Sequence, residues 1–214
     1  MAGSVEIPVF LDGGRLAVKS IILALQKIGI RTEDLRTVLD FGCGCGRVLR
    51  FWKDWPRIEL HGTDCNAALA SWCVKHLPFA QVATNRFNPP TNYADGRFDL
   101  VYALSIFTHL PEAAQLEWMR EFRRIIRPGG LLLLTLHGSY YLPRLNEGEQ
   151  RCFHAGGLVV RNRRVAGSNL CNTFHSEAYV RTRLAASGFD VIDFAPEGAQ
   201  GNPRQDLWLL RCAS

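Results

Sequence analysis

Residues 38–46 read Val38-Leu39-Asp40-Phe41-Gly42-Cys43-Gly44-Cys45-Gly46, an apolar strand that runs through a carboxylate into a loop with glycine at every second position. Glycine has no Cβ atom, so such a loop can turn sharply and let a ligand lie close against the main chain. A tight turn that binds nothing is the alternative. The repeated loss of chain entropy at three glycines favours a binding loop at a strand end.

Short apolar runs alternate with helical patterns from residue 37 to residue 136, on both sides of this loop. That alternation predicts βαβ units around a parallel sheet, and hence an α/β fold. We expect three helices here: one begins at the Gly46 turn, one covers 67–76 and one covers 111–126. The third is expected to stop at Pro128-Gly129-Gly130. The expected strands are 37–40, 59–63, 81–84, 98–103, 131–136, 190–194 and 206–211.

The segments outside this alternation are predicted as parts of a single domain covering residues 1–214. Residues 1–36 form an N-terminal helical segment with an amphipathic stretch at 15–28. Residues 138–175 are rich in Gly, Asn and Arg, which predicts an irregular insertion with one hairpin at 158–165. A helix is expected to resume at 176–187.

Composition favours a soluble chain in a reducing compartment. The 214 residues are 47% hydrophobic and 21% charged, enough for a core without disulfides, and the seven cysteines are an odd, scattered set. No apolar run reaches the roughly 20 residues that cross a membrane. We therefore expect a cytoplasmic protein without a membrane partner. The net charge of +5 is spread over several clusters, so solvated surface is the preferred interpretation and an anionic substrate the alternative.

The loop differs from a dinucleotide-binding loop. Arg47 stands where the third glycine of that fingerprint belongs, and the strand before such a loop does not normally end in a carboxylate such as Asp40. S-adenosylmethionine has no pyrophosphate and carries a cationic amino group, which suits Asp40. Asp64 follows the next apolar strand, where an acidic side chain can accept hydrogen bonds from a ribose diol. Its alternative role is the N-cap of the helix at residue 67.

The whole pattern resembles the class I S-adenosylmethionine-dependent methyltransferases. The resemblance rests on the loop Asp40 to Gly46, on Asp64, on Phe98-Asp99-Leu100-Val101-Tyr102 and on Arg127-Pro128-Gly129-Gly130. It implies a Rossmann-like, doubly wound, mostly parallel seven-stranded sheet with helices on both faces and an antiparallel last strand. It also implies S-adenosylmethionine as methyl donor, with S-adenosylhomocysteine as product and no metal. The implied cofactor-binding residues are Asp40, Gly42, Cys43, Gly44, Gly46, Asp64, Asn85 and Leu104.

Residues 85–111 look like a bacterial subgroup that methylates small molecules or glycans. The closing Gln205-Asp206-Leu207 is similar to a pattern seen there, although Arg204 replaces its histidine. His109 follows the fourth strand, where a histidine can remove a proton from a hydroxyl acceptor; orienting the turn before Pro111 is the alternative role. His137 has a lesser claim to the same role. The acceptor is expected between this strand end and the insertion, whose Tyr140, Tyr141, Arg144 and Arg151 can supply walls and anion contacts.

Two other motifs are judged to be decoys. Asn88-Pro89-Pro90-Thr91 looks like a motif of amino-group methyltransferases, but it precedes the fourth strand and lacks the aromatic residue, so DNA is not expected as substrate. Cys152, His154, Cys171 and His175 have the wrong spacing for a zinc finger.

Two other functions stay open: a nicotinamide oxidoreductase, and a non-catalytic module that binds the cofactor or RNA through Arg161 to Arg164. RNA is not expected.

Overall fold

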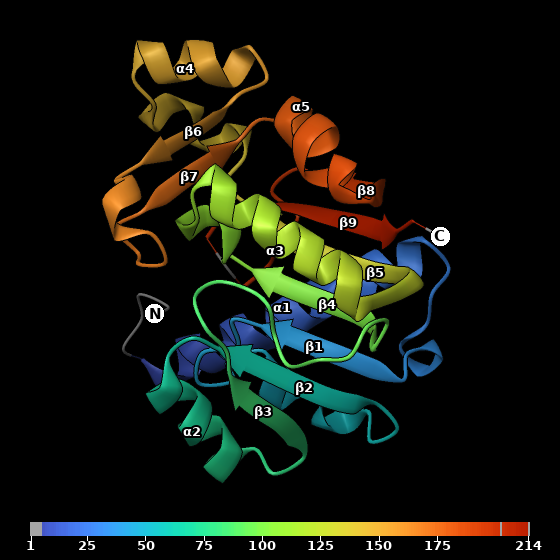
Figure 1. The fold of residues 1–214 in the computed structure, drawn as a ribbon. Coiled ribbons are helices and arrows are strands. Elements are labelled where there is room, and N and C mark those ends of the chain that lie inside the picture. The colour runs from blue at the N-terminus through green and yellow to red at the C-terminus, as the bar shows by residue number, and fades with distance from the viewer. Residues whose placement is uncertain (1–5, 202, 214) are drawn as a thin grey trace.

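A seven-stranded sheet forms the centre of the chain, whose computed structural model describes residues 6–201 and 203–213. The strand order is β3-β2-β1-β4-β5-β9-β8 (Figure 1). β9 is antiparallel to both of its neighbours, and the pairs from β3 to β5 are parallel. The predicted fold class is confirmed. The strands are β1 Thr37–Phe41, β2 Glu59–Asp64, β3 Ala80–Thr84, β4 Phe98–Leu104, β5 Ile126–Leu136, β8 Phe189–Ala195 and β9 Asp206–Cys212.

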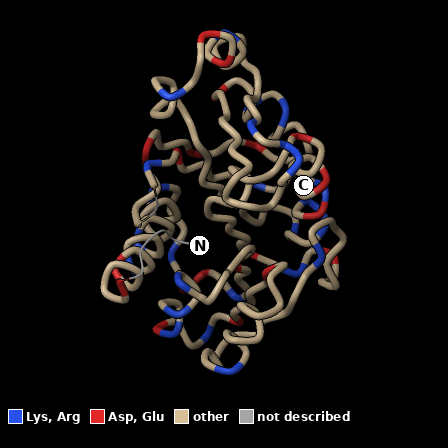
Figure 2. Tube along the Cα trace, turned by 90° about the vertical axis from the view of Figure 1, so that its left-hand side faces the viewer, with Lys and Arg blue, Asp and Glu red and all other residues tan. Residues whose placement is uncertain are grey.

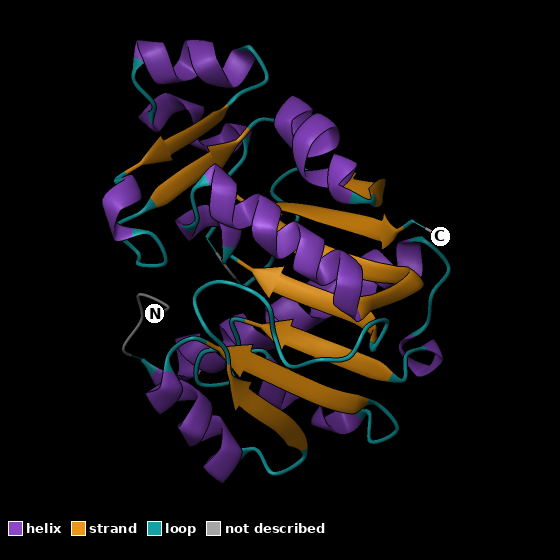
Figure 3. Ribbon diagram, viewed as in Figure 1, coloured by secondary structure: helices purple, strands orange, loops and turns teal. Residues whose placement is uncertain are grey.

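Helices cover both faces of this sheet (Figure 3). Successive strand side chains point to opposite faces, so Leu39 packs in one core and Val38 in the other. The core around Leu39 includes α3 (Glu112–Ile125) and the helical stretch 177–187, which begins as α5 (Glu177–Tyr179). The core around Val38 includes α1 (Ile7–Lys27), the 3-10 helix Leu49–Asp54 and α2 (Ala67–His76). Both faces of the central strands are thereby removed from water.

The N-terminal helix lies directly against the residue that follows the glycine loop. A Cβ atom on Gly14 would stand 2.0 Å from the carbonyl oxygen of Arg47, a distance that no side chain tolerates. One on Gly201 would stand 1.9 Å from the carbonyl oxygen of Gly13. The glycines therefore permit α1 to touch both the loop and the segment before β9. The helix begins earlier than the predicted stretch 15–28.

Two predictions near the loop and in the middle of the chain are wrong in detail. The Gly46 turn leads into a 3-10 helix, not an α-helix, and Leu49 and Trp52, three residues apart on it, are both fully buried. α3 ends at Ile125, and Ile126 is already extended. Pro128-Gly129-Gly130 thus lies inside β5, next to a bulge in its pairing with β4, and does not stop the helix.

Residues 138–175, here named the two-stranded unit, are more regular than predicted. They contain a 3-10 helix Ser139–Arg144, the helix α4 (Glu147–His154) and the antiparallel strands β6 (Leu158–Arg161) and β7 (Asn172–His175). The predicted hairpin at 158–165 is wrong, because β6 pairs with β7 across a longer connection. A small apolar cluster holds the unit together: Tyr141, Leu145, Phe153, Val159 and Phe174. It lies beside the carboxyl end of β5 (Figure 1).

Charge is distributed over many segments, with Lys and Arg close to Asp and Glu along much of the chain (Figure 2). Arg161, part of the basic stretch weighed for RNA, pairs with Glu149 of α4. Among residues 6–201 and 203–213, no helix is long and apolar enough to cross a membrane.

Candidate functional site

The carboxyl ends of β1, β2 and β4 meet at one edge of the sheet, where the strand order reverses between β1 and β4. Ligands of open α/β sheets bind at such a switch point. The glycine loop turns there because the N–H groups of Gly42 and Cys43 both donate to the carbonyl oxygen of Thr63 in β2, at 2.7 and 3.0 Å. The structure thus places the loop where the sequence predicts it.

The three loop glycines differ in what surrounds them. A Cβ atom on Gly42 would lie 2.1 Å from Ile106, and one on Gly46 would lie 2.3 Å from Leu77, so a side chain at either position would have to displace a neighbour within the protein. Apart from its two chain neighbours, no described residue lies within 4 Å of the position that a Cβ atom on Gly44 would take. The backbone of Gly44 is therefore open toward the site, as close approach of a ligand requires.

Asp40 is buried at the bottom of this loop, only 4% exposed, and its Oδ2 atom has no well-formed hydrogen bond among the described residues. Burial raises the pKa of Asp40 to about 7, although the Tyr102 hydroxyl and the Arg47 charge favour the ionised form. A buried carboxylate oxygen without a partner is costly. A cationic ligand group would satisfy it, which fits the amino group of S-adenosylmethionine.

Asp64 ends β2 and shapes the loop. Its Oδ2 accepts a hydrogen bond from the Gly44 N–H, and its Oδ1 accepts one from the Asn66 N–H, each at 2.8 Å. The predicted alternative, that Asp64 caps α2, is wrong, because Asn66 caps that helix by accepting from Ala68 and Leu69. Each carboxylate oxygen has a second lone pair, so acceptance from a ribose diol stays compatible with this geometry.

We expect Asp64→Ala to weaken binding of S-adenosylhomocysteine by about tenfold to a hundredfold, since a hydrogen bond to a charged acceptor contributes about 1.5 to 3 kcal/mol. Calorimetric titration measures this loss. Because Asp64 also holds Gly44, the 2′-deoxyribose analogue of the ligand serves as control. Wild type should favour the ribose form, and Asp64→Ala should bind both forms equally. A ribose preference that survives the mutation would leave Asp64 with the loop alone.

The other predicted cofactor residues surround the same edge. Asn85 follows β3, but its amide is already engaged: Oδ1 accepts from Thr63 Oγ1 at 2.9 Å and Nδ2 donates to the Arg86 carbonyl oxygen at 2.6 Å. Leu104 ends β4 and is half-buried. Cys43 is buried beneath the loop. Sequence reasoning missed Cys73, whose Sγ donates to the Gly44 carbonyl oxygen at 3.4 Å; no motif marks it.

Two histidines, His109 after β4 and His137 after β5, lie close enough to influence each other electrostatically. His109 donates from Nδ1 to the carbonyl oxygen of Cys171 at 2.9 Å, since a carbonyl can only accept, so in the neutral imidazole the lone pair lies on Nε2. The His137 ring bonds to the backbone of Thr173, and its Nδ1 has no described partner. Burial, assisted by His109, lowers the pKa of His137 to about 4. Both rings are thus held by the two-stranded unit.

The residues proposed for acceptor contacts have separate surroundings. Tyr141 is buried with its ring centroid 4.3 Å from that of His137, and Arg144 lies over the Tyr141 ring. Tyr140 is 37% exposed. Arg151 pairs with Glu147 on the surface of α4. Tyr140, Tyr141 and Arg144 therefore gather near His137, and Arg151 is engaged on the outer helix.

The decoy motifs occupy structural positions. Thr91 donates from its backbone N–H and its hydroxyl to Glu121 of α3, so the Asn88 to Thr91 stretch anchors the loop before β4. No group of three or more His, Cys, Asp or Glu side chains suited to a metal occurs in the part of the chain that the structure describes. His175 is buried, and its Nε2 lies 3.2 Å from Gln115 Oε1.

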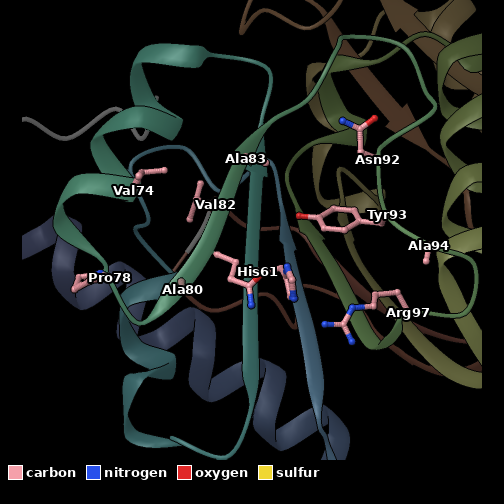
Figure 4. Close-up of a pocket in the computed structure, with 11 residues that line it drawn as sticks. His61, Val74, Pro78, Ala80, Val82, Ala83, Asn92, Tyr93, Ala94 and Arg97 are labelled. Carbon is pink, nitrogen blue, oxygen red and sulfur yellow. The ribbon is translucent and has the colours of Figure 1, made fainter.

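A cavity of about 740 Å³ lies on the sheet face at β2 and β3, beneath the loop that leads to β4 (Figure 4). His61, Val82, Tyr93 and Arg97 line it. Asp40, Gly44 and Asp64 do not. The cavity is therefore separate from the carboxyl edge where the loop and the carboxylates meet.

Comparison with known proteins agrees with this geometry. A malonyl-[acyl-carrier protein] O-methyltransferase of Pseudescherichia vulneris is 28% identical over 140 residues, 64% of this chain and 52% of that protein, so the match spans about half of the relative's length. An S-adenosylmethionine-dependent methyltransferase of Methanosarcina mazei has the same fold, with a TM-score of 0.65 at 16% identity over 88% of this chain and 97% of that chain.

A glycopeptide N-methyltransferase solved with S-adenosylmethionine is similar in fold as well, with a TM-score of 0.63 at 17% identity over 91% and 92% of the two chains. The family model described as a methyltransferase domain matches residues 15–193. That range includes the glycine loop, both carboxylates and His109. The chain therefore belongs to the methyltransferase-domain family, and with it to the class I S-adenosylmethionine-dependent methyltransferases.

Proposed function

We propose that this chain transfers the methyl group of S-adenosylmethionine to an oxygen atom of a small or glycan-linked acceptor. The observation that carries the donor half is the buried Asp40 below the glycine loop, whose Oδ2 has no well-formed hydrogen bond among the described residues. The sulfonium supplies an activated methyl group. The chain itself has to hold donor and acceptor in line and keep water out.

The roles of the side chains follow from their positions. Asp40 accepts from the amino group of the donor, and Asp64 accepts from its ribose. His109 presents Nε2 as a base for the acceptor hydroxyl, because Nδ1 is tied to Cys171. The acceptor lies between the end of β4 and the two-stranded unit, near Tyr140 and His137. An O-methyltransferase among the relatives supports oxygen as the acceptor atom, whereas a fold neighbour methylates nitrogen.

The donor half is tested by the pH dependence of S-adenosylhomocysteine binding. With its pKa raised to about 7, Asp40 is protonated in the free chain at pH 5.5 and must lose that proton to pair with the ligand's ammonium group. Affinity should therefore rise by about tenfold per pH unit toward pH 7 and then level off. Calorimetry at pH 5.5, 6.5 and 7.5 measures the profile.

Asp40→Asn is the matched control, because it keeps the shape of the side chain without the titration. It should bind weakly with a flat profile. The same slope in Asp40→Asn would assign the dependence to another group. The alternative of a nicotinamide oxidoreductase is wrong, because the methyltransferase-domain family model matches residues 15–193. The glycine loop also leads into the 3-10 helix Leu49–Asp54, whereas a dinucleotide-binding loop places the pyrophosphate at the N-terminus of an α-helix.

A further inference from the structure

Ser105, the first residue after β4, has an unusual backbone conformation. Its φ angle is +62°, in the left-handed region that favours glycine, and serine has no amide side chain to compensate as asparagine does. Residues held in this region persist only where their surroundings fix them, and they concentrate at functional sites. Ser105 stands at the edge that carries the candidate site.

A closed ring of hydrogen bonds fixes Ser105. Its N–H donates to Thr135 Oγ1 at 2.8 Å, Thr135 Oγ1 donates to Gln205 Oε1 at 2.7 Å, and Gln205 Nε2 donates to Ser105 Oγ at 2.8 Å. Gln205 is fully buried and Thr135 is 1% exposed. The ring thus joins the ends of β4 and β5 to the residue that precedes β9. In this low-dielectric position each bond is costly to lose.

The turn at Ser105 places side chains on both halves of the site. Ile106 lies against Gly42, at the point where a Cβ atom would stand 2.1 Å from its Cδ1. Three residues further along, the 3-10 turn Phe107–His109 carries the candidate base. Thr108 donates back to the Ser105 carbonyl oxygen at 2.7 Å, which ties that turn to the same residue. The backbone at residue 105 therefore sets the spacing between the glycine loop and His109.

We propose that Gln205 is a positioning residue, which holds Ser105 in its left-handed conformation and thereby keeps Ile106 against the cofactor loop. This inference rests on the proposed function. Gln205 reaches no ligand itself, because its side chain is enclosed by protein. Its effect on cofactor affinity is exerted through Ser105.

Gln205→Met tests this, because methionine has a similar volume and makes no such hydrogen bonds. Calorimetry with S-adenosylhomocysteine should show affinity about tenfold weaker than wild type. Thr135→Val removes another corner of the ring and should weaken binding similarly. Ser105→Gly, which adopts positive φ without help, should bind nearly as wild type does.

The double variant Ser105→Gly with Gln205→Met decides between positioning and mere stability. It should recover affinity to within about threefold of Ser105→Gly, while its melting temperature stays as low as that of Gln205→Met. A double variant that binds as weakly as Gln205→Met, or a Gln205→Met chain with wild-type affinity, would overturn the proposal. A wild-type chain that binds no S-adenosylhomocysteine would overturn the proposed function instead.

Discussion

Gly44→Val is expected to remain folded and to lose measurable affinity for S-adenosylhomocysteine, a loss of more than about a hundredfold. Beyond its chain neighbours, a Cβ atom at this position meets no atom of residues 6–201 or 203–213 within 4 Å, so the added side chain fills space that the ligand needs and not space that the core needs. Calorimetric titration gives the affinity, and circular dichroism gives the melting temperature.

The φ angle of +56° at Gly44 adds strain of about 1–3 kcal/mol for any residue with a side chain, and this has to be separated from loss of the site. Gly29→Val is the matched control. Gly29 has φ +78° and open space around its Cβ position, and it lies at the end of α1. The two variants should melt at similarly reduced temperatures, and Gly29→Val should bind normally. Unchanged affinity in a folded Gly44→Val chain would refute the donor site.

For a hydroxyl acceptor, His109→Asn should slow turnover by roughly a hundredfold or more without weakening S-adenosylhomocysteine binding. Asparagine places its Nδ2 where the histidine Nδ1 donates to Cys171, so the tie to the two-stranded unit is kept and only the basic nitrogen is lost. Turnover is measured as S-adenosylhomocysteine released with a panel of sugar hydroxyls and carboxylates. His154→Ala, on exposed α4, controls for loss of a histidine elsewhere.

The acceptor class changes the expected outcome of this experiment. A carboxylate is already ionised at neutral pH and needs no base, so His109→Asn should then leave turnover nearly unchanged. His109 would not be the base if His109→Asn turned over carboxylate acceptors slowly and hydroxyl acceptors at the wild-type rate. Weaker cofactor binding in His109→Asn would show that the residue supports the loop instead.

Much of the fold could be predicted because the central strands are apolar on both faces and the glycine loop marks the end of β1. Asp64 was placed correctly at the end of β2 for the same reason. The alternative that Asp64 caps α2 could not be decided from the sequence, because two polar residues, Asp64 and Asn66, precede the same helix start and cannot be ranked without coordinates.

The two-stranded unit was the least predictable part. β6 and β7 have four residues each and are separated by a connection, so no short-range turn signal reveals their pairing. The Ser105 ring was equally hidden, because Thr135 and Gln205 are 70 residues apart. The tie between His109 and Cys171 uses a main-chain carbonyl, which leaves no trace in side-chain pattern.

That tie has an evolutionary consequence. Both the Cys171 carbonyl oxygen at Nδ1 and the Gly167 N–H that donates to the His109 carbonyl oxygen come from the two-stranded unit, not from the sheet. A descendant that exchanged this unit for another would lose the group that selects the tautomer of residue 109. The replacement would have to bring its own acceptor oxygen to the imidazole. If His109 is the base, a change of this unit would alter its tautomer together with any acceptor contacts that the unit supplies.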